Sequence, residues 1–498
     1  MNRSSDRRGA RDGAIAPSAS AVAAGALESR RLTAQRRLGG NRSGASTPDV
    51  PGNIAPPWWA NPAILAAGFI IPMFTLVFVI PTLFGTSALQ LRSAIYFEFR
   101  YFGLGLAFLF SLLIGCMLGQ LIRPGLPKPG HKQEEYISLI YLELMALMTI
   151  GAYLIWFRGV FTSPAAMVSL IKGDGEFGNI RYTSRTIGGV TTFTQCGLTY
   201  IILYLDRVWG LKQPIEQRRF KWYVVMILGL TVFRAHFWAE RLSLIEVMVP
   251  IGLLFFCYRD RGTNPILRLV RMAGPILGIG FLIVFFGMME YFRSWSAHYS
   301  DVETSFWGFV MRRFLAYYYT ALNNGAGLLM MMDWPTYNME HVLSWVYRFP
   351  VMIGPIFRYA FDVETFDYVF LDKFADPEFN NMSGIFTIFY DMGVGGSLLY
   401  AGLWGCVAGA AYSSMRARRG FLRLLYPLLF LSILEVMRVI YLGDPRAFPA
   451  IITLMLGYGM FRTRVGVPRQ LHQISRARRH STVKGVWYRP RIGRLFGR

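Results

Sequence analysis

Residues 62–84 read PAILAAGFIIPMFTLVFVIPTLF, without a single charged side chain. Residues 101–122 form a second run of the same kind. A helix of this length spans the roughly 30 Å hydrocarbon core of a bilayer. Such runs recur along a chain of 498 residues that is 53% hydrophobic and only 16% charged. The composition excludes a soluble enzyme, a disordered chain and a coiled coil, and it predicts an all-α integral membrane protein.

Further apolar runs bring the expected number of transmembrane helices to about ten. They cover residues 136–157, 186–205, 221–238, 242–258, 272–289, 384–415, 424–442 and 447–461. Residues 1–57 are rich in Ala, Ser, Gly, Pro and Arg without periodicity, which is typical of a disordered tail and not of a signal peptide. The predicted organisation is a basic tail at 1–57, helices 1–7 within 58–289, a large loop at 290–383, helices 8–10 within 384–461 and a second basic tail at 462–498.

The basic residues predict which side of the membrane the tails occupy. Ten crossings place both tails on one side, and 36 of the 52 Lys and Arg residues lie in the tails and in the short loops of that side. The other 16 are spread over much longer segments. Because basic loops stay in the cytoplasm, both termini are expected to be cytoplasmic. The net charge of +23 then reflects orientation and attraction to anionic membrane lipids, and not nucleic acid binding.

No pattern in the sequence predicts a metal or another cofactor. The four cysteines all lie inside apolar runs, so neither a disulfide framework nor a zinc site is expected. Gly173-Asp174-Gly175 and Gly443-Asp444-Pro445 read as ordinary turns, since a metal-binding DxD motif is absent there. The histidines have no HxxxH or HxxE spacing, although His236, His298 and His341 are on or near the outer face and are possible general bases.

The outer loop at 290–383 is rich in aromatic and acidic side chains. It carries four tryptophans, the run Tyr317-Tyr318-Tyr319 and 11 acidic residues against 6 basic ones. Aromatic rings with carboxylates nearby suit sugars, and Tyr317, Tyr318, His298 and Glu303 are the sugar-binding candidates. The alternative is an aromatic belt at the membrane interface. Residues 306–332 read as an amphipathic helix lying on or dipping into the membrane.

Arginines on the outer face are the strongest chemical signal in the sequence. A guanidinium at membrane depth costs at least about 2.5 kcal/mol, so such a residue needs a partner. Because a guanidinium group can donate two parallel hydrogen bonds to phosphate oxygens, several arginines on this face predict a site for a lipid pyrophosphate. In the alternative interpretation, these arginines pair with lipid headgroups or with Glu240 and Glu246. Glu435 and Arg438 are three residues apart and are expected to pair with each other. The predicted pyrophosphate-binding set is Arg181, Arg185, Arg234, Arg241, Arg312 and Arg313.

Three stretches give the chain a family resemblance. They are residues 181–189, which open the fourth span, the Glu240-Arg241-Leu242-Ser243 turn, and residues 383–412 with the run Tyr390-Asp391-Met392-Gly393. In layout and in these segments the chain resembles the Wzy-type O-antigen and exopolysaccharide polymerases. The resemblance implies a bundle like that of the GT-C glycosyltransferases, with a large extracytoplasmic (periplasmic) loop, in the inner membrane of a bacterium.

The resemblance also implies a substrate and a reaction. Enzymes of this family polymerise oligosaccharide repeat units that are linked to undecaprenyl pyrophosphate, and they require no nucleotide sugar. Membrane lipids and a chain-length regulator protein are the other partners that the resemblance implies. Positioned arginines stabilise a pyrophosphate leaving group without a metal, and inversion at the anomeric carbon needs a general base.

The base has several candidates, namely Glu240, His298, Asp301 and Glu303, among which Glu240 is preferred because it sits beside Arg241. Two other functions are kept open. An O-antigen ligase shares the fold and the donor but transfers the glycan to another acceptor. A transporter or flippase of lipid-linked oligosaccharide normally shows two related halves, and no such repeat is visible in this sequence.

Overall fold

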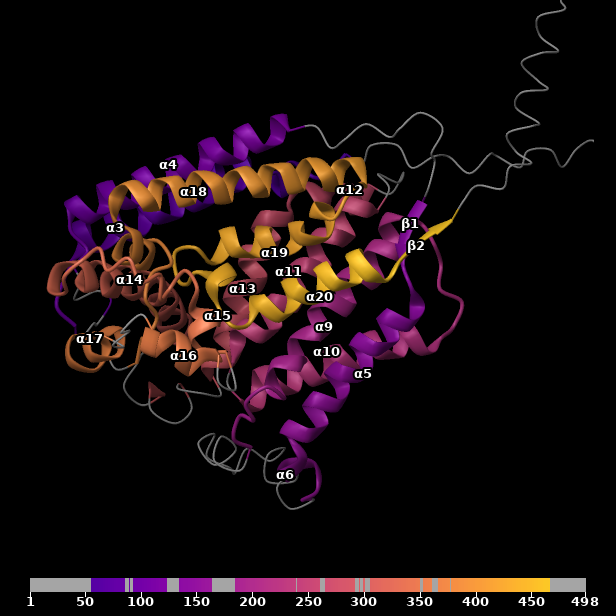
Figure 1. Cartoon of the computed structure of the whole chain (residues 1–498). Helices are drawn as coiled ribbons and strands as arrows, with labels where there is room; N and C mark the ends of the chain where they lie inside the picture. Colours follow the sequence, from indigo (N-terminus) through magenta and orange to yellow (C-terminus); the bar gives the residue numbers. More distant parts are fainter. Residues whose placement is uncertain are drawn as a thin grey trace, which may run out of the picture. The chain divides into compact units, whose positions relative to one another are not determined.

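The structure is a computed structural model, shown in Figure 1. It describes residues 55–85, 89, 93–122, 134–163, 184–238, 240–259, 265–291, 295, 299–300, 305–349, 353–360, 366–376 and 378–465. Helices dominate these residues, as the apolar runs predict. The predicted tails lie almost entirely outside the described residues.

Each predicted membrane span contains helical structure, but residues 186–190 of the fourth span and 436–440 of the ninth are not helical. Among the described residues, four helices are long and apolar enough to cross a membrane, and α11, α13 and α20 are shorter apolar helices. The chain is thus a mostly helical protein with helices that could span a membrane, whereas the count of about ten crossings stays a prediction. The helices are α2 (Pro62–Leu65), continued by η2 (Ala66–Ile70) and α3 (Ile71–Phe84), then α4 (Phe99–Leu121), α5 (Leu139–Trp156), η4 (Thr191–Gln195) with α9 (Cys196–Leu205), α10 (Arg219–Phe237), α11 (Arg241–Tyr258), α13 (Gly274–Glu290), α18 (Phe386–Ala417), α19 (Leu422–Glu435) and α20 (Ala447–Met460).

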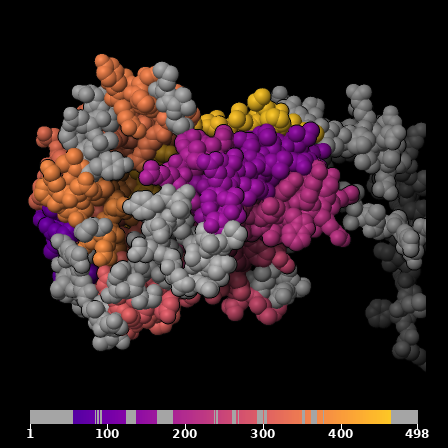
Figure 2. Space-filling model, turned by 90° about the horizontal axis from the view of Figure 1, so that it is seen from below, coloured from indigo at the N-terminus to yellow at the C-terminus, as the bar shows by residue number. Residues whose placement is uncertain are grey.

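Shorter elements connect these helices. They are η1 (Trp58–Ala60), α6 (Arg158–Phe161), η5 (Asp206–Gly210), α12 (Pro265–Met272), α15 (Ser344–Tyr347), α16 (Ile353–Ala360), α17 (Phe366–Phe374) and η7 (Tyr441–Gly443). The large loop also contains the long helix α14 (Phe306–Met331). In the face drawn in Figure 2, orange atoms of the large loop lie to one side of the purple and magenta atoms of the helices between residues 139 and 258.

The second half of α14 is buried in protein. Asn323 and Asn324 are fully buried there. The Asn323 side-chain oxygen accepts hydrogen bonds from the backbone N–H groups of Tyr96 and Phe97, at 2.7 and 3.0 Å. The Asn324 amide donates to the carbonyls of Phe379 and Asn381. Buried amides that are hydrogen-bonded in this way fix α14 to the strand-like segment before α4 and to the end of the loop, so its C-terminal half belongs to the protein core.

Helices α4 and α18 lie side by side and make the closest helix contact of the fold (Figure 1). Both carry glycines four residues apart, Gly115 and Gly119 on α4 and Gly405 and Gly409 on α18. A Cβ on Gly119 would overlap the carbonyl oxygen of Cys406, and the other three glycines meet backbone in the same way. Small residues at this spacing let two helix backbones touch, which is a main source of attraction between helices in lipid.

Segments that the basic-residue count assigns to the tail side contact one another. Strand β1 (Glu134–Ile137) pairs antiparallel with β2 (Arg462–Val465), a short ribbon that the sequence did not predict. The Trp59 indole donates to the carbonyl of Arg271 at 2.9 Å. Arg423 and Asp206 form a buried ion pair at 3.1 Å. The contacts thus join segments that the prediction places on one side of the membrane, whereas the side that they occupy stays a prediction.

Candidate functional site

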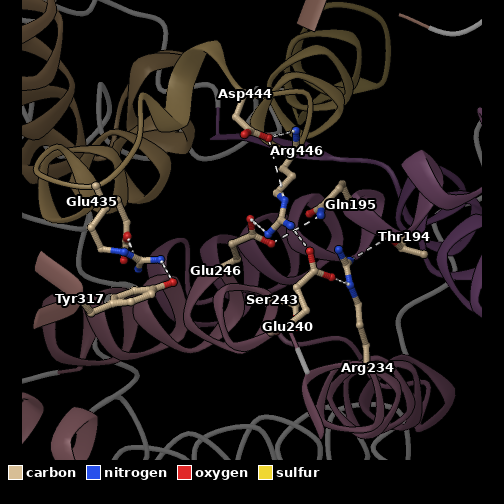
Figure 3. Close-up of polar contacts among 11 residues, drawn as sticks. Thr194, Gln195, Arg234, Glu240, Ser243, Glu246, Tyr317, Glu435, Asp444 and Arg446 are labelled. Atoms are coloured by element: carbon tan, nitrogen blue, oxygen red, sulfur yellow. Dashed lines mark hydrogen bonds and ion pairs between the residues drawn. The ribbon is translucent and has the colours of Figure 1, made fainter. Parts of the chain in front are cut away.

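A cluster of charged side chains lies where α10 ends, where α11 begins and just before α20 (Figure 3). Glu240, in the turn between α10 and α11, accepts a hydrogen bond from the Arg234 guanidinium at 2.6 Å through one carboxylate oxygen. Its other carboxylate oxygen accepts from Arg446. Both arginines come from helix ends, where the chain leaves the apolar bundle. Glu240 therefore bridges two guanidinium groups that are far apart in the sequence.

A second carboxylate, Glu246, lies one turn into α11. One of its oxygens lies 3.9 Å from the Arg446 guanidinium, and the other accepts from the Gln195 amide at 3.4 Å. The side chain of Glu246 is 2% exposed. Arg234 also donates to the Thr194 hydroxyl and lies over the Trp156 ring. The two arginines and the two carboxyl groups contact each other, which offsets part of the free energy that burying them together costs.

Arg446 is the member of this cluster that solvent reaches. Its side chain is 29% exposed, whereas that of Arg234 is 8% exposed. Burial and the positive charge of Arg234 lower the pKa of Arg446 to about 9, so the guanidinium is still protonated at neutral pH. Asp444, two residues earlier, accepts from the Arg446 backbone N–H at 2.9 Å. Burial raises the pKa of Asp444, which the backbone hydrogen bond and Arg348 only partly oppose.

Arg446 and Asp444 also line a cavity of about 700 Å³. The rest of the lining comes from the large loop and from the residues around the start of α18 and the end of α19. A volume of this size is within the range of small-molecule sites. The charged, hydroxyl and amide groups on its wall are Glu340, His341, Ser344, Tyr347, Arg348, Arg358, Asp372, Asn380, Asn381, Thr387, Asp444 and Arg446.

The wall of this cavity combines two kinds of polar group. Arg348, Arg358 and Arg446 provide guanidinium groups, of which Arg358 donates through Nε to the Tyr347 carbonyl at 2.9 Å. Guanidinium forks bind phosphate oxygens, while amides and carboxylates suit sugar hydroxyls. Burial, together with nearby Glu340 and Asp391, raises the pKa of Tyr347, so its hydroxyl stays protonated. The cavity thus fits a ligand that has both anionic and hydroxyl-rich parts.

One imidazole on this wall has a carboxylate behind it. His341 Nδ1 lies 2.7 Å from Oδ1 of Asp391, whose side chain is fully buried. The other oxygen of Asp391 accepts from the backbone N–H groups of His341 and Val342, at 2.8 and 2.9 Å. A carboxylate in this position fixes the orientation and the tautomer of the ring.

The structure places Arg313, one of the predicted pyrophosphate ligands, in a cluster of its own. Its guanidinium lies 2.6 Å from Glu378 and 3.0 Å from Glu290, over the Tyr299 ring. Burial by itself lowers the pKa of Arg313, but the two carboxylates outweigh it and the net shift is upward. Arg234 contacts Glu240 instead, as the structural alternative for that residue expected. Arg234 and Arg313 thus belong to separate clusters with different carboxylates.

Of the other predicted site residues, some make contacts within the protein and some lie outside the described residues. Arg185 is exposed and Arg312 is half-buried. Tyr317 accepts a hydrogen bond from Arg438, which also pairs with Glu435 at 2.7 Å, as the spacing of that pair predicted (Figure 3). Tyr318 packs against Phe314. Arg181, His298, Asp301, Glu303 and the side chain of Arg241 lie outside the described residues.

The predicted site residues that the structure describes are not among those that line the cavity. Arg348, Arg358 and Arg446 were missed, and His341 was considered only as one of several bases. Asp444 was read as part of an ordinary turn, yet it lies in the cavity beside Arg446. The signal in the sequence was the pair of charged residues in Asp444-Pro445-Arg446, which lies between two apolar runs at a turn predicted to be on the outer side.

Within the part of the chain that the structure describes, no group of three or more His, Cys, Asp or Glu side chains is arranged to hold a metal ion. Metal independence of the predicted reaction stays a prediction for experiment. The four cysteines are separate thiols, three of them buried. The chain matches no protein-family model, no curated protein and no solved structure.

Proposed function

We propose that this protein is an integral membrane glycosyltransferase that polymerises oligosaccharide repeat units carried on undecaprenyl pyrophosphate. The observation that carries the proposal is the cavity of about 700 Å³ at the large loop, with three arginines and several amide and carboxyl groups on its wall. A ligand with a diphosphate next to sugar rings needs both kinds of group. The helices that can span a membrane give such a lipid-linked substrate access from the bilayer.

In the proposed reaction, a hydroxyl of one repeat unit attacks the anomeric carbon of the glycan on a second lipid. The new glycosidic C–O bond forms as the anomeric C–O bond to the diphosphate breaks, and the electron pair leaves with the lipid diphosphate. Guanidinium groups stabilise the negative charge that develops on the leaving group. Arg446 is well suited to this role, because Glu240 and Glu246 hold its guanidinium while its side chain, 29% exposed, also lines the cavity.

The test is a reconstituted polymerisation assay. Purified protein in liposomes is supplied with undecaprenyl-pyrophosphate-linked repeat units, and the products are separated on a gel. We expect a ladder of polymer from the wild type, with Arg446→Lys weaker and Arg446→Ala reduced on the order of 10²-fold or more, because Lys keeps the charge but loses the fork. Arg219→Ala is the matched control, since Arg219 forms an exposed ion pair with Glu143 away from the cavity.

A wild-type ladder that Arg446→Ala leaves unchanged at normal protein levels contradicts the assignment of the cavity. Absence of a ladder from the wild type contradicts the polymerase itself. In that case, transfer of the glycan to a different acceptor identifies a ligase, and movement of intact lipid-linked units across the bilayer identifies a flippase. An arm with excess EDTA tests metal independence: activity that disappears and returns with Mg²⁺ or Mn²⁺ refutes that part of the proposal.

A further inference from the structure

Helix α18 is interrupted close to the cavity, and a loop segment is attached at the break. Gly393 has φ +68° and ψ −175°, a backbone conformation that residues with a side chain rarely adopt. Near this break the carbonyls of Tyr390 and Asp391 accept hydrogen bonds from the backbone N–H groups of Thr336 and Tyr337, at 2.9 and 2.8 Å. A continuous helix uses such carbonyls internally, so the break provides the attachment site for the loop.

The same loop continues to His341, and Asp391 holds it there through three contacts. They are the two backbone N–H groups and the ring nitrogen Nδ1 described above. From the other side, η7 packs directly on this segment: a Cβ on Gly443 would lie 2.5 Å from the Val342 carbonyl oxygen and 2.7 Å from that of His341. His341 is thus fixed between α18 and η7 and is among the residues that line the cavity. Its Nε2 is shielded from solvent, so an acceptor hydroxyl reaches this nitrogen only when the side chains around it move.

We infer that His341 accepts the proton of the attacking hydroxyl and that Asp391 is the residue that positions it, an inference that rests on the proposed function. In this step the O–H bond of the acceptor sugar breaks as its oxygen bonds to the anomeric carbon, and the proton moves to Nε2 of His341. Nδ1–H donates to Asp391, which compensates the positive charge that the ring gains. The diphosphate leaves with the electron pair of the broken anomeric bond.

The charged surroundings of His341 matter for any pH dependence. Asp391 and the ring of Tyr390 face it from α18, the latter edge-on at 5.7 Å between ring centroids. Since Asp391 contacts the ring directly, it is the group whose change affects the imidazole most. The remaining titratable and charged groups around the cavity are Glu340, Tyr347, Arg348, Arg358, Asp372, Asp444 and Arg446.

Asp391→Asn is the decisive variant. The Asn oxygen can still accept from the two backbone N–H groups, so the loop stays attached. Its amide, however, donates to Nδ1 and forces the proton of the neutral ring onto Nε2, which then cannot accept another. We expect kcat to fall on the order of 10²- to 10⁴-fold, with His341→Gln falling as far. The acidic limb of any residual pH–rate profile should move to lower pH, because the imidazolium has lost its counter-charge.

A second readout does not depend on activity. Nitrogen NMR of protein labelled with ¹⁵N-histidine distinguishes the two neutral tautomers, and His341→Gln assigns the signal among the six histidines. We expect Nδ1–H in the wild type and Nε2–H in Asp391→Asn. Gly393→Ala is the second variant, because strain at the helix break should disturb the same signal without touching either side chain. Glu216→Gln, the same carboxyl-to-amide change at an exposed position, should alter neither readout.

The outcomes separate the two proposals. If the wild type polymerises and Asp391→Asn does so at the wild-type rate, the inference is wrong and the polymerase function stands. An unchanged tautomer in Asp391→Asn also overturns it. If the wild type makes no polymer, the proposed function fails, and the step assigned to His341 fails with it, whatever tautomer the ring adopts.

Discussion

Two buried ion clusters in this protein both pair arginine with carboxylates, and they differ in what surrounds them. We call the cluster of Arg423 and Asp206 the closed cluster and that of Arg446, Glu240 and Glu246 the open cluster. In the first, Arg423 contacts both oxygens of Asp206 at 3.1 to 3.2 Å, and Tyr258 donates to the same carboxylate at 2.9 Å. Their side chains are almost completely buried, with 3% exposure for Arg423 and 6% for Asp206. This cluster connects the end of α9 to α11 and α19 and offers no surface to a ligand.

In the second cluster, Arg446 contacts Glu240 and Glu246 but is 29% exposed and lines the cavity. Its side chain both contacts these carboxylates and lines the cavity. The comparison teaches that a buried arginine is not in itself a sign of function. What matters is whether some of its donors face a space that a ligand can enter.

The largest expected effect is a loss of stability when the closed cluster loses its arginine. Arg423→Ala leaves the Asp206 carboxylate buried without its counter-charge, and we expect the free energy of unfolding to fall by about 3–5 kcal/mol. Thermal unfolding in detergent and the yield of monodisperse protein measure it. The double variant Asp206→Asn with Arg423→Met should recover most of the loss, because no buried charge remains. A mild effect of Arg423→Ala, similar to that of an exposed arginine such as Arg219, would remove the distinction between the two clusters.

An intermediate effect on stability is expected from Glu240→Gln, and this variant also tests what Glu240 of the open cluster does. The amide keeps the shape but not the charge, so we expect a loss of stability of about 1–3 kcal/mol, with Arg446 still near Glu246. If His341 is the base, Glu240→Gln polymerises within about tenfold of the wild type, with the same pH profile. If Glu240 is the base, as its position beside Arg241 first predicted, activity falls on the order of 10²- to 10⁴-fold. The same polymerisation assay decides between them.

The smallest effect concerns Asp444 at the edge of the open cluster. Burial raises the pKa of its carboxyl, so its ionised form is less stable in the folded protein than in the unfolded chain. The stability that the protonated form contributes is lost as the pH rises through the raised pKa. Asp444→Asn removes this loss. We expect its melting temperature to exceed that of the wild type by roughly 1–2 °C at high pH, and the two to converge at low pH. A difference that does not change with pH contradicts this account.

Much of the fold could be predicted from the sequence, because membrane helices are decided locally. In a bilayer each backbone polar group must be satisfied within its own helix, so an apolar run of sufficient length specifies its structure by itself. The ion pair of Glu435 and Arg438 was also local, three residues apart on the same turn. The buried second half of α14 was missed, because its anchoring amides meet partners that are distant in the sequence. The partners of Asn323 are more than two hundred residues away, and those of Asn324 are 55 and 57 residues away.

The candidate site was only partly predicted, because its contacts join residues that are far apart in the sequence. The sequence by itself determined that the chain is mostly helical, with helices that could span a membrane, and that charged groups gather in the large loop and at helix ends. Only the tertiary structure decided which charges meet. Glu240 and Arg446 are separated by 206 positions, and His341 and Asp391 by 50, so no spacing rule connects them. Ion pairs and hydrogen bonds depend on distances of a few ångströms between side-chain atoms, and in a helical bundle the packing of distant helices sets those distances.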